Sequence, residues 1–474
     1  VGAWLLGRWS LGRTWPALLL LVYVIQPEVV PSVRAGAFFV ALAALVLNEF
    51  SRWSAAKNSD EAAHSRLPTW LVSVLLFVAF LTLYVVTLAS DVLAADSGEL
   101  QVVAAQLGVA HPPGFPLYVM LAHLFTRLPV GSPAYAVNVL SAVFGALTVV
   151  VVYRSGWLLA GRQLPALLGA VALGTATTFW SQATTANVRS LTTLLAALAI
   201  YHLLEFRIAT IGYATRKTPR QPYLHEAPES QANIRIASGA SSNPDRWLTW
   251  LALVIGLGLT HHVSLAFLAI VGLMFVFVTD PGLVRSPRRW APPLAVGLLG
   301  LLPLLYLPLR AGADVRGASP QLATLPGFLE HVLATGFRGD LFYYLAPADL
   351  GPRLLVMGNV MTFQFAPLLL AVMLIGLLLL LWRDRPLALL LSGTFAVYAV
   401  VTATYRAPQT VEYMMPAYVP AALALVYAVG RLPNALPHWR GAGPVLGVLL
   451  TALLLVAALG QVSGHISAAG ANHE

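Results

Sequence analysis

Long apolar runs separated by short polar loops recur along the whole 474-residue chain. A helix needs roughly 17–25 apolar residues to cross a bilayer, and about thirteen runs reach or approach that length. We place these spans at 15–32, 34–50, 69–90, 134–158, 164–180, 189–206, 247–262, 264–279, 290–308, 364–382, 386–403, 413–431 and 441–463. The pattern therefore predicts an all-α polytopic membrane protein with a bundle of about 11–13 transmembrane helices.

Basic residues fall in every second predicted loop, and this alternation gives the orientation. Six loops are basic. In chain order they contain Arg52 with Lys57 and Arg66; Arg162; the segment 207–246; Arg285 to Arg289; Arg383 with Arg385; and Arg431 with Arg440. By the positive-inside rule these loops are cytoplasmic. The segments 91–133, 309–363 and 403–412 then lie on the extracytoplasmic face. Within this scheme 207–246 is a polar, flexible cytoplasmic linker, and 309–363 is an ordered external segment at the membrane surface.

Composition agrees with a membrane protein, because 58% of the residues are hydrophobic and only 10% are charged. The net charge of +9 resides in short loops, where topology requires it, so we predict no nucleic-acid partner. The chain has no cysteine and therefore no disulfide. Its first apolar run follows Arg8 and Arg13 without a small-residue cleavage site, so we expect a retained anchor.

Acidic residues and a histidine gather just after the apolar run 69–90. Asp91, Asp96 and Glu99 are followed by His111-Pro-Pro-Gly, which forces a rigid bend. Carboxylates are costly near lipid, so this group is a candidate functional site; the alternative is a polar loop whose acids face water. Residues 97–107 predict an interfacial helix with Ser97 as its cap, and a second short helix follows at 118–128. We expect the bend to bring His111 to the carboxylates.

These residues also carry a family resemblance. Asp96-Ser-Gly-Glu99 followed by His111-Pro-Pro-Gly-Phe-Pro-Leu-Tyr118 resembles the N-terminal signature of a membrane family once of unknown function. Eukaryotic members of that family are linked to protein O-mannosylation, and the family belongs to the GT-C glycosyltransferase superfamily. Later matches follow in order: Phe179-Trp-Ser-Gln182, Gly256-Leu-Gly-Leu-Thr-His261-His262, Leu307-Pro-Leu-Arg310 and Glu412-Tyr-Met-Met-Pro416.

The resemblance covers about 69–431 and implies a GT-C-like catalytic membrane domain over those residues, with interfacial helices in its first external loop. Residues 1–68 are then an N-terminal extension with two spans, and 432–474 are a C-terminal transmembrane helix and tail. The chain departs from the family at Asn187-Val-Arg189, where relatives carry Glu-Val-Tyr. It departs again at Ala313-Asp-Val-Arg316, where a Trp-Gly-Asp-like stretch is expected. Both departures lie on the outer face, so they put sugar specificity and activity in question.

The function implied by the resemblance is inverting transfer of a sugar from a polyprenyl-phosphate donor to an extracytoplasmic hydroxyl. Protein O-mannosylation is one such reaction, and the acceptor is a protein or a glycan. The implied location is a bacterial plasma membrane, where membrane lipids are further partners. Asp96 suits the general base, and Glu99, one helical turn on, suits an orienting or acceptor-holding role. His111 completes the predicted catalytic set.

The donor phosphate needs cationic groups on the outer face. Arg310, Arg406, His261 and His262 are the candidates, although a terminal arginine also serves as a helix anchor and such histidines are often structural. The matched motifs place Tyr118, Gln182, Glu412 and Tyr413 in the acceptor site or the pocket wall. Asp96, Glu99 and His111 are compatible with a divalent metal, but no metal-specific spacing is present, so we predict no cofactor.

Two other classes remain open. A transporter also uses intramembrane histidines and arginines, but here the charges gather at one surface and no inverted repeat is evident. A catalytically silent membrane scaffold is compatible with Asn187 and Arg189. Transport in liposomes would favour the first class, whereas sugar transfer by the purified protein rejects both.

Overall fold

The computed structural model describes residues 68–217, 243–406, 410–435, 450–458 and 460–461. Every regular element among these residues is a helix. The predicted spans 15–32 and 34–50 lie outside the described residues, as does most of the span 441–463.

Five helical segments of the described chain are long and apolar enough to cross a membrane. They are α4 (Thr69–Val86), α7 (Pro133–Ala160), residues Arg189–Tyr213 of α10 (Arg189–Lys217), the run Pro287–Arg310 and α19 (Arg385–Thr404). Two bent pairs raise the number to seven. They are α8 (Gln163–Gly174) with α9 (Thr177–Ala183), bent by 69°, and α17 (Pro347–Gln364) with α18 (Pro367–Arg383), bent by 120°.

Other helices of the bundle are shorter than the roughly 20 residues that a straight span needs. They include α12 (Pro244–Leu259) and α13 (Leu265–Thr279), of 16 and 15 residues. The all-α, polytopic membrane class is thus confirmed, while fewer full-length spans than the predicted 11–13 occur in the part of the chain that is described. Three of the predicted spans lie wholly or mostly outside the described residues, and the rest of the difference arises because hydropathy counts breaks and short helices as straight spans.

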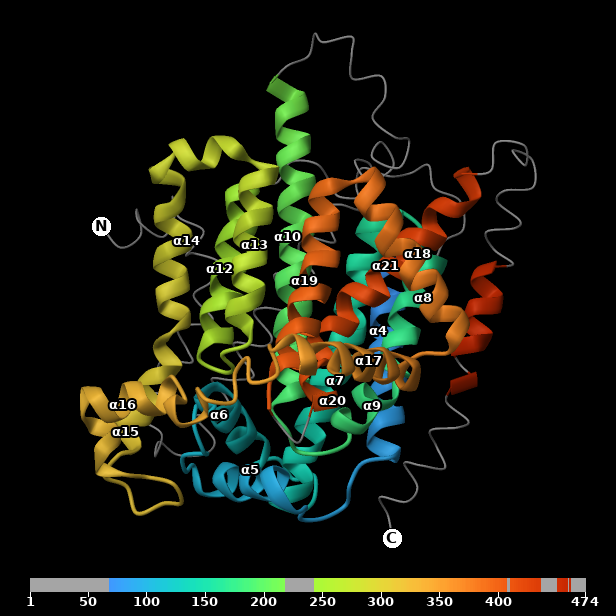
Figure 1. The fold of residues 1–474 in the computed structure, drawn as a ribbon. Coiled ribbons are helices and arrows are strands. Elements are labelled where there is room, and N and C mark those ends of the chain that lie inside the picture. Colours follow the sequence, from blue (N-terminus) through green and yellow to red (C-terminus); the bar gives the residue numbers. More distant parts are fainter. Residues whose placement is uncertain (1–67, 218–242, 407–409, 436–449, 459, 462–474) are drawn as a thin grey trace.

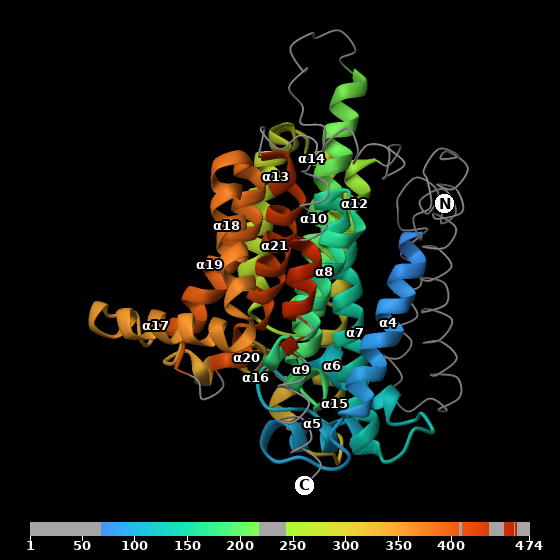
Figure 2. The same ribbon diagram turned by 90° about the vertical axis from the view of Figure 1, so that its right-hand side faces the viewer.

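Helix α21 (Met415–Ala435) occupies the centre of one half of the bundle. It packs against α7, α8, α18 and α19, and its residues 415–430 are all buried (Figures 1 and 2). Small residues make this close packing possible. A Cβ at Gly376 of α18 would stand 2.1 Å from the Ala424 carbonyl oxygen, and one at Gly169 of α8 would stand 3.0 Å from the Ala422 carbonyl oxygen.

The other half is built on α10, which contacts α7, α12 and α13, while α14 (Pro287–Gly300) packs on α12. Helix α10 continues to Lys217 and so extends into the stretch predicted as the cytoplasmic linker, of which residues 218–242 lie outside the described chain. The apolar run ends at residue 206, but the residues that follow have enough helix propensity to continue the helix.

The two ends of the bundle differ in the way that the loop charges predict. Helices α5 (Ala95–Gln106), α6 (Pro116–Phe125), α15 (Tyr306–Arg310) and α16 (Leu325–Val332) gather at one end (Figure 1). The C-terminal end of α10 and the short helix η2 (Pro281–Arg285) lie at the other end. Helix α17 runs across the bundle axis near the first end (Figure 2), as expected for an interfacial helix.

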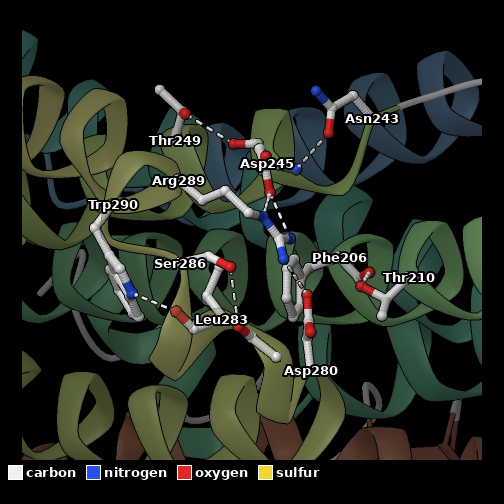
Figure 3. A network of polar contacts seen from close by, with 11 residues as sticks. Phe206, Thr210, Asn243, Asp245, Thr249, Asp280, Leu283, Ser286, Arg289 and Trp290 are labelled. Carbon is white, nitrogen blue, oxygen red and sulfur yellow. Dashed lines mark hydrogen bonds and ion pairs between the residues drawn. The ribbon is translucent and has the colours of Figure 1, made fainter.

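An ion-pair network fixes the second end (Figure 3). Arg289 at the start of α14 donates through Nε and Nη2 to Asp245 Oδ1 at 2.8 and 2.6 Å, and its Nη1 lies 2.8 Å from Asp280 Oδ2. Asp245 opens α12 and Asp280 follows α13, so one guanidinium joins three helices. A planar guanidinium suits this role because it donates in several directions at once.

Candidate functional site

Helix α5 places the acidic pair. It begins at Ala95, and its N-cap residue Ala94 has no side-chain cap hydrogen bond, so the predicted cap at Ser97 is wrong and Ser97 lies in the first turn. Asp96 also lies in that first turn, where the partial positive charge of the helix end favours a carboxylate. Glu99 follows one turn later on the same face.

The bend between α5 and α6 brings His111 back to α5. Its backbone N–H donates to Glu99 Oε1 at 2.9 Å, and its Nδ1 lies 2.6 Å from Glu99 Oε2. Ligand atoms of Asp96, Glu99 and His111 all lie within 4.8 Å of one another. The structure thus gathers the three predicted catalytic residues into one cluster, which we call the acid–histidine cluster.

The contact between Glu99 and His111 changes the protonation of both. The hydrogen bond from His111 is the main reason that the pKa of Glu99 lies below its usual value, against the opposing effect of burial. The same hydrogen bond raises the pKa of His111, with further help from the charges of Glu99 and Asp96. The pair is therefore an ion pair over a wider pH range than isolated side chains would allow.

The far end of α5 is anchored by the segment that follows α14. Arg310 Nε donates to the Leu107 carbonyl at 3.0 Å, and the Tyr306 hydroxyl donates to the Gly108 carbonyl at 2.5 Å. The backbone N–H of Val109 donates to the Arg316 carbonyl at 2.9 Å. The bonds from Arg310 and Tyr306 satisfy carbonyls left open at the helix C-terminus, and the buried Arg310 places its positive charge where the helix end is negative.

Arg189 enters the site from α10. It is the first residue of that helix and is only 8% exposed. Asn187 caps the helix, because its Oδ1 accepts from the backbone N–H groups of Arg189 and Ser190 at 2.9 and 3.0 Å. The residues that depart from the family pattern thus have distinct roles: Asn187 fixes the start of α10, and Arg189 brings a cation to the site.

The positive charge of Arg189 acts on a tyrosine ring and on two histidines near it. Its guanidinium carbon lies 5.2 Å from the ring centroid of Tyr413, at the end of α20 (Thr410–Tyr413). Its charge lowers the pKa of His262 and opposes the raised pKa of His111. Arg189 therefore lies beside the Tyr413 ring and near enough to the acid–histidine cluster for its charge to act on His111.

His261 and His262 line the same region but do not supply cationic charge. The His261 ring is fully buried, with Nε2 2.8 Å from the Val188 carbonyl, and burial lowers its pKa to about 4. His262 Nδ1 lies 2.7 Å from Ser264 Oγ, and its pKa also lies far below the usual value, first because of burial. Both imidazoles are neutral near pH 7, so they offer hydrogen bonds to a phosphate and no charge.

Two of the predicted phosphate ligands lie away from this position. Arg310 bonds Leu107, which is eleven residues along α5 from Asp96, or roughly 16 Å of helix rise. Arg406 donates through Nε to Asp340 Oδ1 at 2.7 Å, with Nη2 at 2.6 Å, and it stacks over Tyr343. Their predicted role in phosphate binding stays a prediction, and the geometry favours Arg189 for that role.

The residues predicted for the acceptor or the pocket are partly assembled. Tyr118 is buried and stacks on His261, with ring centroids 6.2 Å apart. The Tyr413 and His262 ring centroids lie 5.9 Å apart. The pKa of Tyr413 is raised, first by burial, and the charge of the neighbouring Glu412 adds to the increase. Gln182 contributes its backbone carbonyl to Asn187 and Ser190, which links it to the start of α10.

His331 of α16 packs against the bend at Gly114. The sequence did not predict a role for this residue. A Cβ built on Gly114 would stand 2.9 Å from His331 Nε2, and Gly114 has a positive φ of 85°. Only glycine fits such a left-handed, crowded position without strain. Phe115 then packs its ring 5.3 Å from His111 and 6.1 Å from His262.

Asp96, Glu99 and His111 form the one group of described residues whose ligand atoms are close enough to hold a metal ion. Two carboxylates and an imidazole are ligands that several divalent cations accept. Both Glu99 oxygens, however, already accept hydrogen bonds from His111. A cation here would have to compete with that pair.

Comparison with known proteins confirms the resemblance. Residues 96–282 match the family described as the protein O-mannosyl-transferase TMEM260 N-terminal domain. A curated mouse protein of that name is 36% identical over 139 residues, which is 29% of this chain and 20% of the mouse protein. The relative from Dictyostelium discoideum is 26% identical over 319 residues, 64% of this chain and 36% of the relative. The chain thus spans about a third or less of the length of these curated relatives.

Solved structures confirm the fold. ArnT from Cupriavidus metallidurans bound to undecaprenyl phosphate superposes with a TM-score of 0.51 at 16% identity, over 80% of this chain and 63% of ArnT. Its apo form gives a TM-score of 0.52 at 17% identity, over 84% and 72%. The predicted GT-C-like, all-helical membrane fold is therefore correct.

The first prediction concerns the ion pair of Glu99 and His111. Because the pKa of His111 is raised, the pair's contribution is complete below the ordinary histidine value of 6.5 and is lost as pH rises through the raised value. Because the pKa of Glu99 is lowered, the contribution is complete above 4.5 and is lost as pH falls through the lowered value. We expect Glu99→Gln to lower the pH at which His111 titrates, as measured by NMR of histidine-labelled protein.

Glu330→Gln is the matched control, because Glu330 lies exposed on α16 and outside the acid–histidine cluster. His111→Asn identifies the resonance. An unchanged His111 titration in Glu99→Gln would show that the pair does not set the protonation of the site.

Proposed function

We propose that this chain is a glycosyltransferase that moves a sugar from a polyprenyl-phosphate donor to an acceptor hydroxyl at the α5–α6 end of the bundle. The observation that carries the proposal is the acid–histidine cluster, whose residues lie in the part of the chain that matches the O-mannosyl-transferase family, with Arg189 near it. The names of the relatives favour a protein acceptor and mannose as the sugar. ArnT, which shares the fold, binds undecaprenyl phosphate, and this favours a lipid-linked donor.

In the proposed reaction the acceptor hydroxyl oxygen attacks the anomeric carbon of the sugar from the side opposite the phosphate. The new C–O bond forms as the bond from that carbon to the phosphate oxygen breaks, and the phosphate leaves with the electron pair. The configuration at the anomeric carbon is therefore inverted. The hydroxyl proton must pass to a base within about 3 Å.

Asp96 suits the base better than Glu99 does. Both Glu99 oxygens accept hydrogen bonds from His111, and the lowered pKa of Glu99 makes it a weak proton acceptor. The ion pair of Glu99 and His111 instead holds the bend in place against α5, and the positive His111 adds favourable charge for a leaving phosphate. We assign Glu99 and His111 to positioning and Asp96 to proton transfer.

Arg189 suits the leaving phosphate. Its guanidinium is nearly buried, so its interaction with a developing negative charge is weakly screened. His262 can add a hydrogen bond from a neutral ring. The proposal includes no metal, because Arg189 and His111 already supply positive charge to the site.

The location proposed for the site is the extracytoplasmic face of the membrane, which follows from the loop charges and the shared end of α5, α6 and α20. The chain is a multi-pass membrane protein by its apolar helices. The two matched relatives are eukaryotic, so the bacterial plasma membrane stays a prediction from the sequence.

The second prediction tests the base. Asp96→Asn keeps the size of the side chain but removes the proton acceptor, so the turnover of sugar transfer should fall by about 10²–10⁴-fold while donor binding persists. Transfer is measured with purified protein, a radiolabelled polyprenyl-phosphate mannose and a peptide acceptor. Asp91→Asn is the control, since Asp91 is exposed and lies outside the cluster. Normal turnover in Asp96→Asn would remove Asp96 from the role.

The third prediction separates the arginines. Arg189→Lys keeps the charge but loses the paired hydrogen bonds of a guanidinium, so transfer should fall by roughly 10–100-fold. Arg406→Lys can still pair with the Asp340 carboxylate and should stay within about twofold of wild type. Each variant is first checked for an unchanged melting temperature. Full activity of Arg189→Lys together with loss in Arg310→Lys or Arg406→Lys would return the phosphate site to those two residues.

A further inference from the structure

A cavity lies at the end of the bundle opposite to α5 and α6. It holds about 60 Å³ of space that a water-sized molecule can reach, and it is partly open to the outside. Its walls come from the C-terminal turns of α7, the last third of α10, the junction of α18 and α19, and the last described part of α21. None of the residues placed in the proposed reaction lines it.

The inner walls of the cavity are apolar. Leu158 of α7, Leu204 and Ile208 of α10 and Leu387 of α19 form most of that surface. These helices are membrane spans or pack against them, so the walls lie at the depth of lipid chains just inside one boundary of the bilayer. Such a surface favours a hydrocarbon chain over a polar ligand.

The rim of the cavity is charged. Arg207 Nη2 lies 2.9 Å from Asp384 Oδ2, and Asp384 Oδ1 also accepts from the backbone N–H of Leu387 at 3.2 Å. Arg431 lies 4.4 Å over the Tyr427 ring, and its Nε is buried without a hydrogen-bond partner among the described residues. The lining therefore carries two arginines and one aspartate, a net charge of 2 − 1 = +1.

We propose that this cavity binds one anionic phospholipid, with its phosphodiester at Arg431 and one acyl chain along α7 and α10. The net charge of +1 complements the single negative charge of a phosphodiester head group. Asp384 already neutralises Arg207, so Arg431 is the group whose charge remains for the ligand. An apolar wall beneath a basic rim is the arrangement expected for recognition of an anionic lipid. The proposal is independent of the sugar-transfer reaction.

The fourth prediction tests this site. The full chain is purified in a neutral detergent, and native mass spectrometry measures binding of phosphatidylglycerol, phosphatidylcholine with the same chains, and inorganic phosphate. We expect phosphatidylglycerol to bind roughly fivefold more tightly than phosphatidylcholine, because one arginine contributes that order of selectivity near a head group. Inorganic phosphate alone should not bind. Arg431→Gln should remove the preference, whereas Arg383→Gln, which changes an exposed neighbour outside the cavity, should keep it.

A second variant removes the space without touching the charges. A Cβ at Gly212, which lines the cavity, would meet no atom within 4 Å, so the side chain in Gly212→Leu has room to enter it. We expect this variant to weaken binding of both lipids. Equal affinities of the two lipids for the wild type, an equal effect of Arg383→Gln and Arg431→Gln, or unchanged lipid binding in Gly212→Leu would each overturn the proposal. Competition by inorganic phosphate would show that a free anion occupies the site instead.

Discussion

The double contact of His111 with Glu99 is the interaction on which the candidate site depends. It closes the bend between α5 and α6, and this closure sets the distance of His111 from Asp96. The contact holds because both of its ends are fixed. The far end of α5 is anchored through Leu107 and Gly108, and the bend is supported by His331 at a glycine that has no room for a side chain. Without that pair, Asp96 and Glu99 would still share a face of α5, but His111 would not be held beside them.

A second constraint is the placement of charge in a largely apolar protein. A cation buried at the end of a span is costly unless its surroundings compensate it. Arg189 meets this condition through the Tyr413 ring, and Arg310 meets it through the helix end of α5. Arg406 remains exposed in a surface pair with Asp340. The three arginines look alike in the sequence, yet their environments differ, and the environment determines which of them can act on a bound anion.

The sequence predicted the class, the helical fold and the acid–histidine cluster, because each depends on local signals. Apolar length gives the spans, loop charge gives their direction, and the rigid His111-Pro-Pro-Gly bend returns the chain to α5. The position of Arg189 could not be predicted in this way, since it depends on Tyr413, which lies more than two hundred residues away. The sharp bend at Gly174–Thr177, inside the predicted span 164–180, was also missed, because hydropathy measures length and not direction. A signal for Arg189 was nevertheless present: a single arginine at the outer start of an apolar span.

A cryo-electron microscopy structure of the full chain with a bound polyprenyl-phosphate sugar tests the central claim most directly. The account predicts density for the phosphate within hydrogen-bonding distance of the Arg189 guanidinium, with the sugar ring between that phosphate and the Asp96 carboxylate. A phosphate bound instead at Arg406, or at the opposite end of the bundle, with Asp96 distant from the anomeric carbon, would contradict it.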